Sequence, residues 1–185
     1  RTSAALATAL PVRVPLLEDR RGDRIPHKVA PASPETLGIS LAAPDVLYDR
    51  GEVTNLSIAR GTLTDEERFK INEHIIHTLA MLSQLPFPAH LTQVPELAGG
   101  HHERMDGRGY PRGLRGEDMS PVARMLAIAD VYEALTASDR PYKPAKGMEQ
   151  ALAIMDGMAA EGHIDPELYL LFRQANIPQR YAEMH

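Results

Sequence analysis

The sequence contains no cysteine among its 185 residues. This absence excludes disulfide bonds and thiolate metal sites, because both need the sulfur of cysteine. Any metal in this protein would therefore be held by imidazole nitrogens, carboxylate oxygens and water.

The chain also lacks a surplus of positive charge and long apolar runs. Its net charge is −5 at pH 7, which argues against binding to polymeric nucleic acid, since that needs a basic face. A small phosphorylated ligand held by a few local cations stays compatible with this charge. No apolar run reaches the length of a membrane span and no signal-peptide pattern opens the chain, so we expect a cytoplasmic protein. The first residue is Arg1, which is compatible with a fragment of a longer protein.

Helical periodicity is missing from the first part of the sequence. Residues 1–45 hold six prolines, and proline removes a backbone donor and clashes inside helices. We therefore expect residues 1–50 to form an irregular, proline-rich N-terminal segment. Residues 51–185 are expected to form a separate helical domain.

From residue 51 onward the pattern predicts an all-α bundle of about five helices joined by short connections. Thr64 and Glu67 form a capping box, and Ser120 followed by Pro121 is typical of a helix start. The expected helices are residues 64–85, 88–98, 120–137, 148–161 and a last one that begins at Asp165-Pro166. Their predicted inward residues are Ile71, Ile75, Leu79 and Leu82 in the first, Val122, Met125, Leu126, Ala129 and Tyr132 in the third, and Leu168, Leu171 and Phe172 in the last.

The most informative stretch is His101-His102-Glu103, which precedes a loop with glycines at positions 107, 109, 113 and 116. Adjacent neutral imidazoles suit a metal cluster, and glycine lets a backbone approach a ligand closely. The alternative is a surface loop with two solvated histidines. This stretch by itself does not separate the two interpretations.

Two further polar residues lie in helical stretches. His74 is near the predicted inward stripe of its helix, either as a hydrogen-bonded core residue or as a metal ligand, and His77 one turn later is the alternative. Asp130 lies in an apolar stretch with a predicted packed face. A buried carboxylate takes up a proton or finds a cation, so we expect it to meet a metal or an arginine such as Arg124 or Arg140.

Imidazole and carboxylate ligands without sulfur suit iron, manganese, zinc or nickel rather than calcium. Such ions lower the pKa of bound water and clamp both oxygens of an in-line phosphoryl displacement. Arg140 and Lys143 flank a proline turn and are candidates for phosphate contacts, or they form a surface turn paired with Asp139. Tyr110 is a candidate for stacking on a base or donating to a phosphate, or it packs the edge of the bundle.

Two long motifs resemble the HD-GYP domains, which are bacterial phosphodiesterases that degrade cyclic di-GMP. The motifs are HHE-x-x-DG-x-GYP at residues 101–111 and ARMLAIADVYEALTASDRPYK at residues 123–143. The resemblance covers roughly residues 51–182 and implies an HD-type helical bundle with a binuclear or trinuclear iron or manganese centre. It implies a hydroxide activated by the metal that attacks phosphorus and gives pGpG and GMP.

The resemblance also assigns roles to individual residues. It places four residues on metal-ligand positions: His74, His101, His102 and Asp130. It places the following residues on positions that bind the substrate, cyclic di-GMP: Gly109, Tyr110, Pro111, Arg140 and Lys143.

The chain departs from this family at its other defining motif. No His-Asp dipeptide occurs anywhere in the sequence, and His27 in His27-Lys28 is a degenerate counterpart at best. Bridging carboxylates hold two metals close together, so their loss should cripple a two-metal mechanism. Three interpretations remain: an HD-GYP fragment of an active enzyme; an inactive domain that binds cyclic di-GMP or a partner such as a diguanylate cyclase; and a helical scaffold with an incidental single-metal site.

Overall fold

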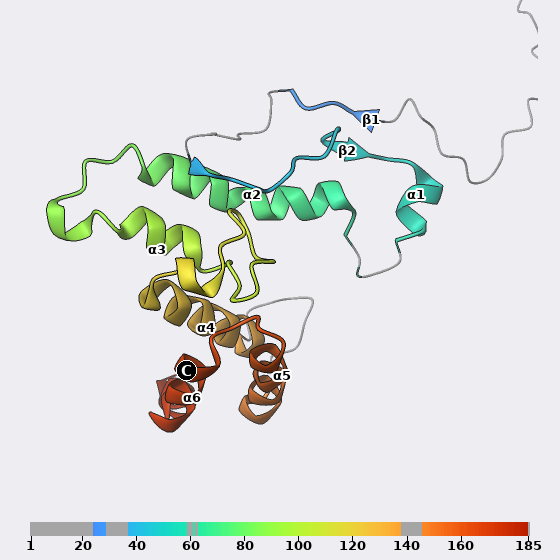
Figure 1. The fold of residues 1–185 in the computed structure, drawn as a ribbon. Coiled ribbons are helices and arrows are strands. Elements are labelled where there is room, and N and C mark those ends of the chain that lie inside the picture. Colours follow the sequence, from blue (N-terminus) through green and yellow to red (C-terminus); the bar gives the residue numbers. More distant parts are fainter. Residues whose placement is uncertain (1–23, 29–36, 59–60, 62, 138–145, 185) are drawn as a thin grey trace, which may run out of the picture. The chain divides into compact units, whose positions relative to one another are not determined.

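The computed structural model describes residues 24–28, 37–58, 61, 63–137 and 146–184 (Figure 1). It divides into two compact units, one made of residues 1–30 and 44–68 and the other of residues 31–43 and 69–185. None of the helices in the described ranges has the length and apolar character needed to cross a membrane. The expected boundary at residue 50 stays a prediction.

The first unit contains a short antiparallel strand pair and a short helix. Strand β1 (Arg24–Ile25) pairs with β2 (Tyr48–Asp49), and helix α1 (Glu52–Leu56) follows. The Arg24 side chain donates to the Asp49 carboxylate across the pair (2.9 Å). The sequence did not predict these strands, because two residues are too few to show an alternating pattern.

Helix α2 (Asp65–Leu82) begins at the predicted capping box. The backbone N–H of Thr64 donates to Glu67 Oε2 (2.9 Å), and the N–H of Glu67 donates to Thr64 Oγ1 (3.2 Å). Both bonds satisfy donors that a helix start leaves without an intrahelical partner. The predicted start of this helix is confirmed.

In the second unit, the inward face of α2 differs from the predicted one. Ile75 and Leu79 are buried as expected, but the Ile71 side chain is 54% exposed. The buried stripe instead includes Ile76, which turns the inward face away from Ile71 and leaves His74 exposed. The expectation that His74 lies near the buried stripe was therefore wrong.

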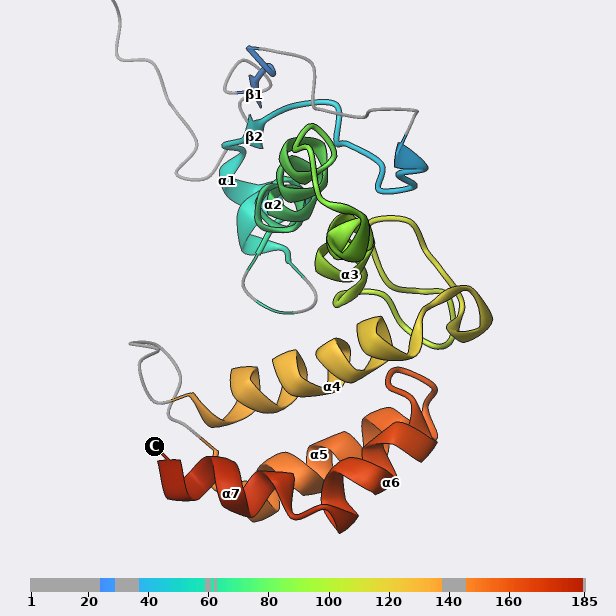
Figure 2. The same cartoon turned by 90° about the vertical axis from the view of Figure 1, so that its left-hand side faces the viewer.

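The other helices of this unit lie in layers. They are η3 (Ala89–Leu91), α3 (Val94–Gly100), η4 (Gly116–Asp118), α4 (Pro121–Thr136), α5 (Met148–Ala160), α6 (Pro166–Gln174) and α7 (Ile177–Met184). In Figure 2, α4 lies between α3 on one side and α5, α6 and α7 on the other. The all-α prediction is confirmed, with α1 and α7 as helices that it missed.

Helix α4 starts where the sequence predicts, but it buries a different face. Ser120 Oγ accepts from the N–H of Ala123 (3.3 Å), so the N-cap is confirmed. Of the predicted inward residues only Tyr132 is buried, and the others are exposed: Val122, Met125, Leu126 and Ala129. Ala123, Ala127 and Ile128 turn inward instead, and α3 approaches α4 closely where Gly100 meets Ala123.

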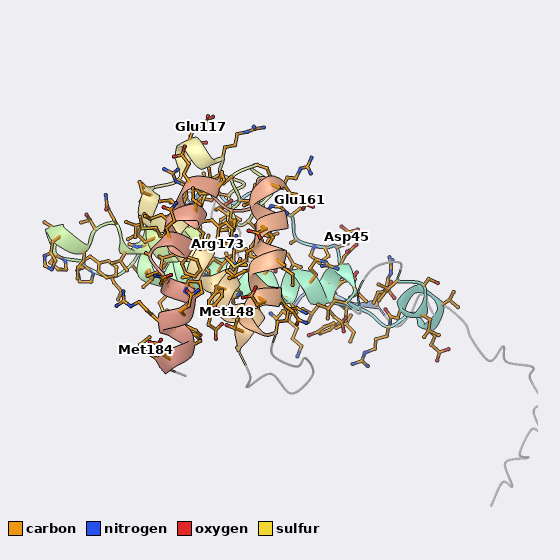
Figure 3. The ribbon with its side chains drawn as sticks, turned by 90° about the horizontal axis from the view of Figure 1, so that it is seen from below. Asp45, Glu117, Met148, Glu161, Arg173 and Met184 are labelled. Carbon is orange, nitrogen blue, oxygen red and sulfur yellow. The ribbon has the colours of Figure 1, made fainter. Side chains whose placement is uncertain are left out.

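The main core lies between α4, α5 and α6. Met155 and Ile164 are almost fully buried there, and Tyr169 is 4% exposed. The Arg173 side chain, labelled in Figure 3, reaches from α6 to Asp156 of α5 (2.7 Å). Leu171 was predicted to point inward, but it is 55% exposed because Tyr169 occupies the inward position.

Candidate metal centre

Three histidines from two separate segments meet in the second unit. His74 lies in α2, whereas His101 and His102 follow directly after α3. Each ring offers a nitrogen, and these nitrogens all lie within 4.8 Å of one another. The structure thus brings together three of the four predicted ligands from positions 28 residues apart in sequence.

Backbone carbonyls fix the orientation of two of these rings. His74 Nδ1 lies 2.6 Å from the carbonyl oxygen of Ile71, and His101 Nδ1 lies 2.8 Å from that of Ala98. A carbonyl only accepts, so Nδ1 must carry the proton and Nε2 keeps a free lone pair in the neutral ring. A hydrogen bond of this kind to the second nitrogen is typical of metal-binding histidines.

The spacing of the nitrogens fits a metal ion. His102 Nε2 lies 3.3 Å from His74 Nε2. Two nitrogens bound to one ion at about 2.1 Å are themselves roughly 3.0 to 3.4 Å apart. The three donors of this cluster are imidazole nitrogens, which suit zinc, copper, iron or nickel. The residues present therefore fit a divalent transition-metal ion.

Asp130 lies beside this histidine cluster but faces a different nitrogen. Its Oδ2 is 3.9 Å from His102 Nδ1, and its side chain is 44% exposed. The expectation of a packed, buried carboxylate was wrong, because the exposed face of α4 carries Asp130. No arginine among the described residues pairs with it, since Arg124 binds Asp165 instead (2.7 Å). Its role as a ligand stays a prediction.

The surroundings of His102 determine its protonation state and which ring nitrogen is available to a metal. The pKa of His102 is lowered to about 4, mainly by burial and secondly by the charge of His101. The carboxylate of Asp130 acts in the opposite direction. The ring is neutral at pH 7 and carries one proton. With that proton on Nδ1, on the side of Asp130, Nε2 would be free for a metal beside His74, although the 3.9 Å between Nδ1 and Asp130 Oδ2 is longer than a hydrogen bond.

The loop of residues 104–115 folds back over the paired histidines. The Tyr110 ring stacks on the His102 ring with centroids 4.8 Å apart and an interplanar angle of 22°. Gly109 lies directly on the backbone of Glu103 and Arg104, where any Cβ would overlap. Pro111 is buried, and its carbonyl accepts from the N–H groups of Ser40 (2.8 Å) and Leu41 (3.2 Å). The Gly-Tyr-Pro sequence thus sets the position of the loop against the histidines.

Glu103 is a structural anchor of this loop that the sequence interpretation missed. It is 2% exposed, and its carboxylate accepts from the N–H groups of Arg112 (2.7 Å) and Leu114 (2.9 Å). Burial raises its pKa, while these N–H groups and the charge of Arg112 act in the opposite direction. The sequence did offer a sign of this role, because Glu103 directly follows the predicted ligands His101 and His102 and precedes the glycine-rich loop.

A cavity of about 540 Å³ lies next to the cluster. His101 and Asp130 form part of its lining, and the rest is mainly apolar and aromatic. The aromatic side chains come from α4, α6 and α7, namely Tyr132, Phe172 and Tyr181. Sequence reasoning placed only Tyr132 and Phe172, as core residues, and it did not predict α7.

The remaining candidates do not lie in the cluster. His77 is exposed and lies 3.7 Å from Glu73, outside the group of three nitrogens. In the first unit, the His27 ring is hydrogen-bonded to the carbonyl of Pro44 (2.9 Å). Arg140 and Lys143 fall in residues 138–145, which lie outside the described residues.

Comparisons with known proteins identify the family of this chain. Residues 28–168 match the family model of the HD domain. The chain is 33% identical over 168 residues to the 3'3'-cGAMP-specific phosphodiesterase 3 of Vibrio cholerae, covering 88% of this chain and 35% of that protein. It is 43% identical over 115 residues to a cyclic di-GMP phosphodiesterase of Pseudomonas aeruginosa, covering 62% of this chain and 27% of that one.

A third relative is a cyclic di-GMP phosphodiesterase response regulator of Xanthomonas campestris. It is 40% identical over 147 residues, covering 72% of this chain and 37% of the relative. The chain thus spans about a third of the length of these curated relatives. Since the family match extends over most of the chain and includes every described residue of the site, this protein belongs to the HD domain family, as its resemblance to HD-GYP domains predicts.

Proposed function

We propose that this chain provides the metal centre of a phosphodiesterase that hydrolyses cyclic dinucleotides, with cyclic di-GMP as substrate. The observation that carries the proposal is the cluster of His74, His101 and His102, with ring nitrogens within 4.8 Å of one another. A divalent ion bound there would supply Lewis acidity toward a phosphoryl oxygen and would generate a nucleophile from water. The names of the relatives support a cyclic dinucleotide as the substrate.

The groups around the cluster have separate roles in this proposal. The carbonyls of Ile71 and Ala98 hold two imidazoles with Nε2 toward the ion position. Asp130 either orients His102 through Nδ1 or turns to become a fourth ligand, which its half-exposed side chain allows without loss of packing. Tyr110 is held beside the ion position by its stack on His102, where it meets the phosphate or a base of the substrate.

The finer parts of the proposal follow from the resemblance to HD-GYP domains. Iron or manganese is the metal, and the product is pGpG, with GMP after a second cleavage. Gly109 and Pro111 hold Tyr110 toward the substrate, and Arg140 and Lys143 contact its phosphates. We also propose a cytoplasmic location, where a diguanylate cyclase domain would be a partner.

A second candidate function is a domain that binds a cyclic dinucleotide or a signalling partner without cleaving it. The observation that favours it is the absence of a His-Asp dipeptide from the sequence. The three histidines suffice for one ion, whereas a two-metal clamp needs further carboxylates to bridge the ions. The two candidates share the metal centre and differ in whether product forms.

Metal analysis of the purified chain tests the proposal. After loading with Mn²⁺ or Fe²⁺, we expect bound metal in the wild-type chain, a loss of most of it in His102→Ala, and a reduced content in Asp130→Ala. His77→Ala is the matched control, since this exposed histidine lies one turn from His74 but outside the cluster. Equal metal content in His102→Ala and His77→Ala would refute the site.

Incubation with cyclic di-GMP then separates the two candidate functions. Formation of pGpG that depends on metal and is lost in His102→Ala supports the enzyme. Retained metal and dinucleotide binding without any product supports the binding domain.

A further inference from the structure

Residues 37–41, here called the strap, are hydrogen-bonded to the loop that carries the Gly-Tyr-Pro sequence. The backbone N–H groups of Ser40 (2.8 Å) and Leu41 (3.2 Å) donate to the carbonyl oxygen of Pro111, and so does the Ser40 hydroxyl (3.2 Å). Pro111 is buried, and a buried carbonyl without hydrogen-bond partners is costly. The strap thus supplies partners for a buried polar group of the loop.

A turn at Gly38 lets the strap contact the loop on both sides of the turn. Gly38 has a φ of +64°, which glycine adopts without the steric cost of a Cβ. No atom lies within 4 Å of a Cβ built there, so the backbone conformation and not a lack of space requires glycine. Before the turn, the carbonyl of Leu37 accepts from Arg112 Nε (3.0 Å), and after it Ser40 binds Pro111. The strap therefore holds two adjacent residues of the loop.

The strap differs from the other anchor of this loop, which is the Glu103 carboxylate. Glu103 binds backbone N–H groups that lie 9 and 11 residues later in the chain, so it closes the loop on itself. The strap binds residues that lie 71 and 75 positions away from its own, through a loop carbonyl and an arginine side chain. The two anchors use different groups of the loop, so one cannot replace the other.

Tyr110 is the residue whose position depends on these bonds. Its ring stacks on His102, and its N–H donates to the carbonyl of His102 through a long bond of 3.2 Å. Tyr110 directly precedes Pro111, and a proline has a fixed φ and restricts the conformation of the residue before it. A shift of Pro111 is therefore passed on to Tyr110 and to its stack on the histidine.

We propose that the strap is a positioning segment for the substrate, because it holds Pro111 so that Tyr110 stays stacked on His102 beside the ion position. The inference rests on the proposed function, in which Tyr110 meets the dinucleotide. It adds residues 37–41 to those on which the affinity for the dinucleotide depends. The histidines of the cluster have their own backbone partners, so the metal content should not depend on the strap.

Proline substitutions test the position of Tyr110 without any substrate. Gly38→Pro forces a negative φ at the turn, and Ser40→Pro removes both donors of Ser40 to the loop carbonyl. Ala42→Pro is the matched control, since Ala42 is exposed and its N–H donates to no residue of the loop. In nuclear magnetic resonance spectra of the chain loaded with diamagnetic Zn²⁺, Tyr110 should lose the ring-current shift from the stacked histidine in the two strap variants and keep it in the control. An unchanged Tyr110 signal in both strap variants would overturn the inference.

Binding of cyclic di-GMP to the Mn²⁺-loaded chain tests the consequence for the substrate. We expect calorimetry to show about fivefold weaker binding in Ser40→Pro, as for the loss of an ordinary hydrogen bond, with the Mn²⁺ content of wild type. In a Tyr110→Ala background, Ser40→Pro should weaken binding no further, because the strap acts through Tyr110. Additive losses in the double variant would overturn the inference, and so would a loss of Mn²⁺ in Ser40→Pro. Ser40→Ala removes only the hydroxyl donor and should weaken binding about twofold, which keeps the test usable if the proline unfolds the chain.

The two measurements separate this inference from the proposed function. A wild-type chain that binds no cyclic di-GMP, but whose Tyr110 signal depends on the strap, would refute the proposed function and support the positioning of Tyr110. Binding that Tyr110→Ala weakens and both Ser40 variants leave unchanged would support the proposed function and overturn the role of the strap.

Discussion

At Gly109 the loop over the histidines leaves no room for a side chain. A Cβ there would overlap the backbone of Glu103 and Arg104, and backbone cannot rotate aside as a flexible side chain can. The contact sets the distance between the loop and the metal-binding segment, and with it the stack of Tyr110 on His102. A glycine in this motif is thus required by close packing, and its main role is steric.

Gly109→Ala should therefore destabilise the protein by about 1–3 kcal/mol, the usual cost of overpacking. The measurement is the free energy of unfolding from urea denaturation. Gly157→Ala is the matched control, because a Cβ at Gly157 in α5 would meet no atom within 4 Å. That substitution should stabilise by about 0.5–1 kcal/mol, as glycine weakens a helix interior. A Gly109→Ala variant as stable as wild type would contradict the packing argument.

At the scale of helices, one N-cap residue, Asp165, also joins its helix to another helix. Asp165 caps α6 by accepting from the N–H groups of Glu167 (2.9 Å) and Leu168 (3.0 Å). Its other oxygen accepts from Arg124 of α4 (2.7 Å), and Asp165 is 5% exposed. The same carboxylate therefore starts one helix and ties it to another. Ser120, by contrast, caps α4 through a single longer bond of 3.3 Å.

Asp165→Ala should cost about 3–5 kcal/mol of unfolding free energy, because it leaves the partly buried charge of Arg124 without its partner. Ser120→Ala should cost only about 1 kcal/mol, the usual value for a lost N-cap. Both are measured by urea denaturation. Arg124→Met in the Asp165→Ala background should recover part of the loss. Similar losses in the two single variants, or no recovery in the double variant, would count against this explanation.

For the whole molecule, a tyrosine in the core between α5 and α6 should make the free energy of unfolding fall as the pH becomes alkaline. The Tyr169 hydroxyl donates to the carbonyl of Leu152 (3.0 Å) and to the Asp156 carboxylate (3.0 Å). Burial raises the pKa of Tyr169 to about 12, and the hydrogen bond and charge of Asp156 act in the same direction. The folded protein thus retains this proton at pH values where the unfolded chain has released it.

The stabilisation from this group should be fully present below about pH 10, the pKa of an unperturbed tyrosine. It should be lost as the pH rises from about 10 to 12, since the unfolded chain then binds fewer protons than the folded one. The check is the urea midpoint between pH 8 and pH 12, compared with Tyr169→Phe, which should lose less stability over this range. The same slope in both proteins would show that other groups cause it.

The sequence by itself determined where α2, α4 and α6 begin and which residue types the site contains, whereas the helix expected at residues 88–98 is instead η3 followed by α3 from Val94. The capping box of α2 and the N-caps of α4 and α6 were predicted correctly because they depend on side chains within three residues of each other. The two long motifs also identified the family, since they carry the histidines and the Gly-Tyr-Pro loop in a specific order. These features are local, so neighbouring residues are enough to specify them.

Only the tertiary structure decided which faces are buried and what surrounds the histidines. Ile71, Met125 and Leu171 are apolar but exposed, because the packing partner of a helix, and not its own sequence, selects the buried face. The aromatic cavity depends on contacts between residues far apart in the chain, and the anchoring role of Glu103 depends on how the loop returns to it at Arg112 and Leu114. The position of Asp130 could not be predicted from the sequence either, because its apolar sequence neighbours suggested burial, whereas the fold leaves its side chain 44% exposed beside His102.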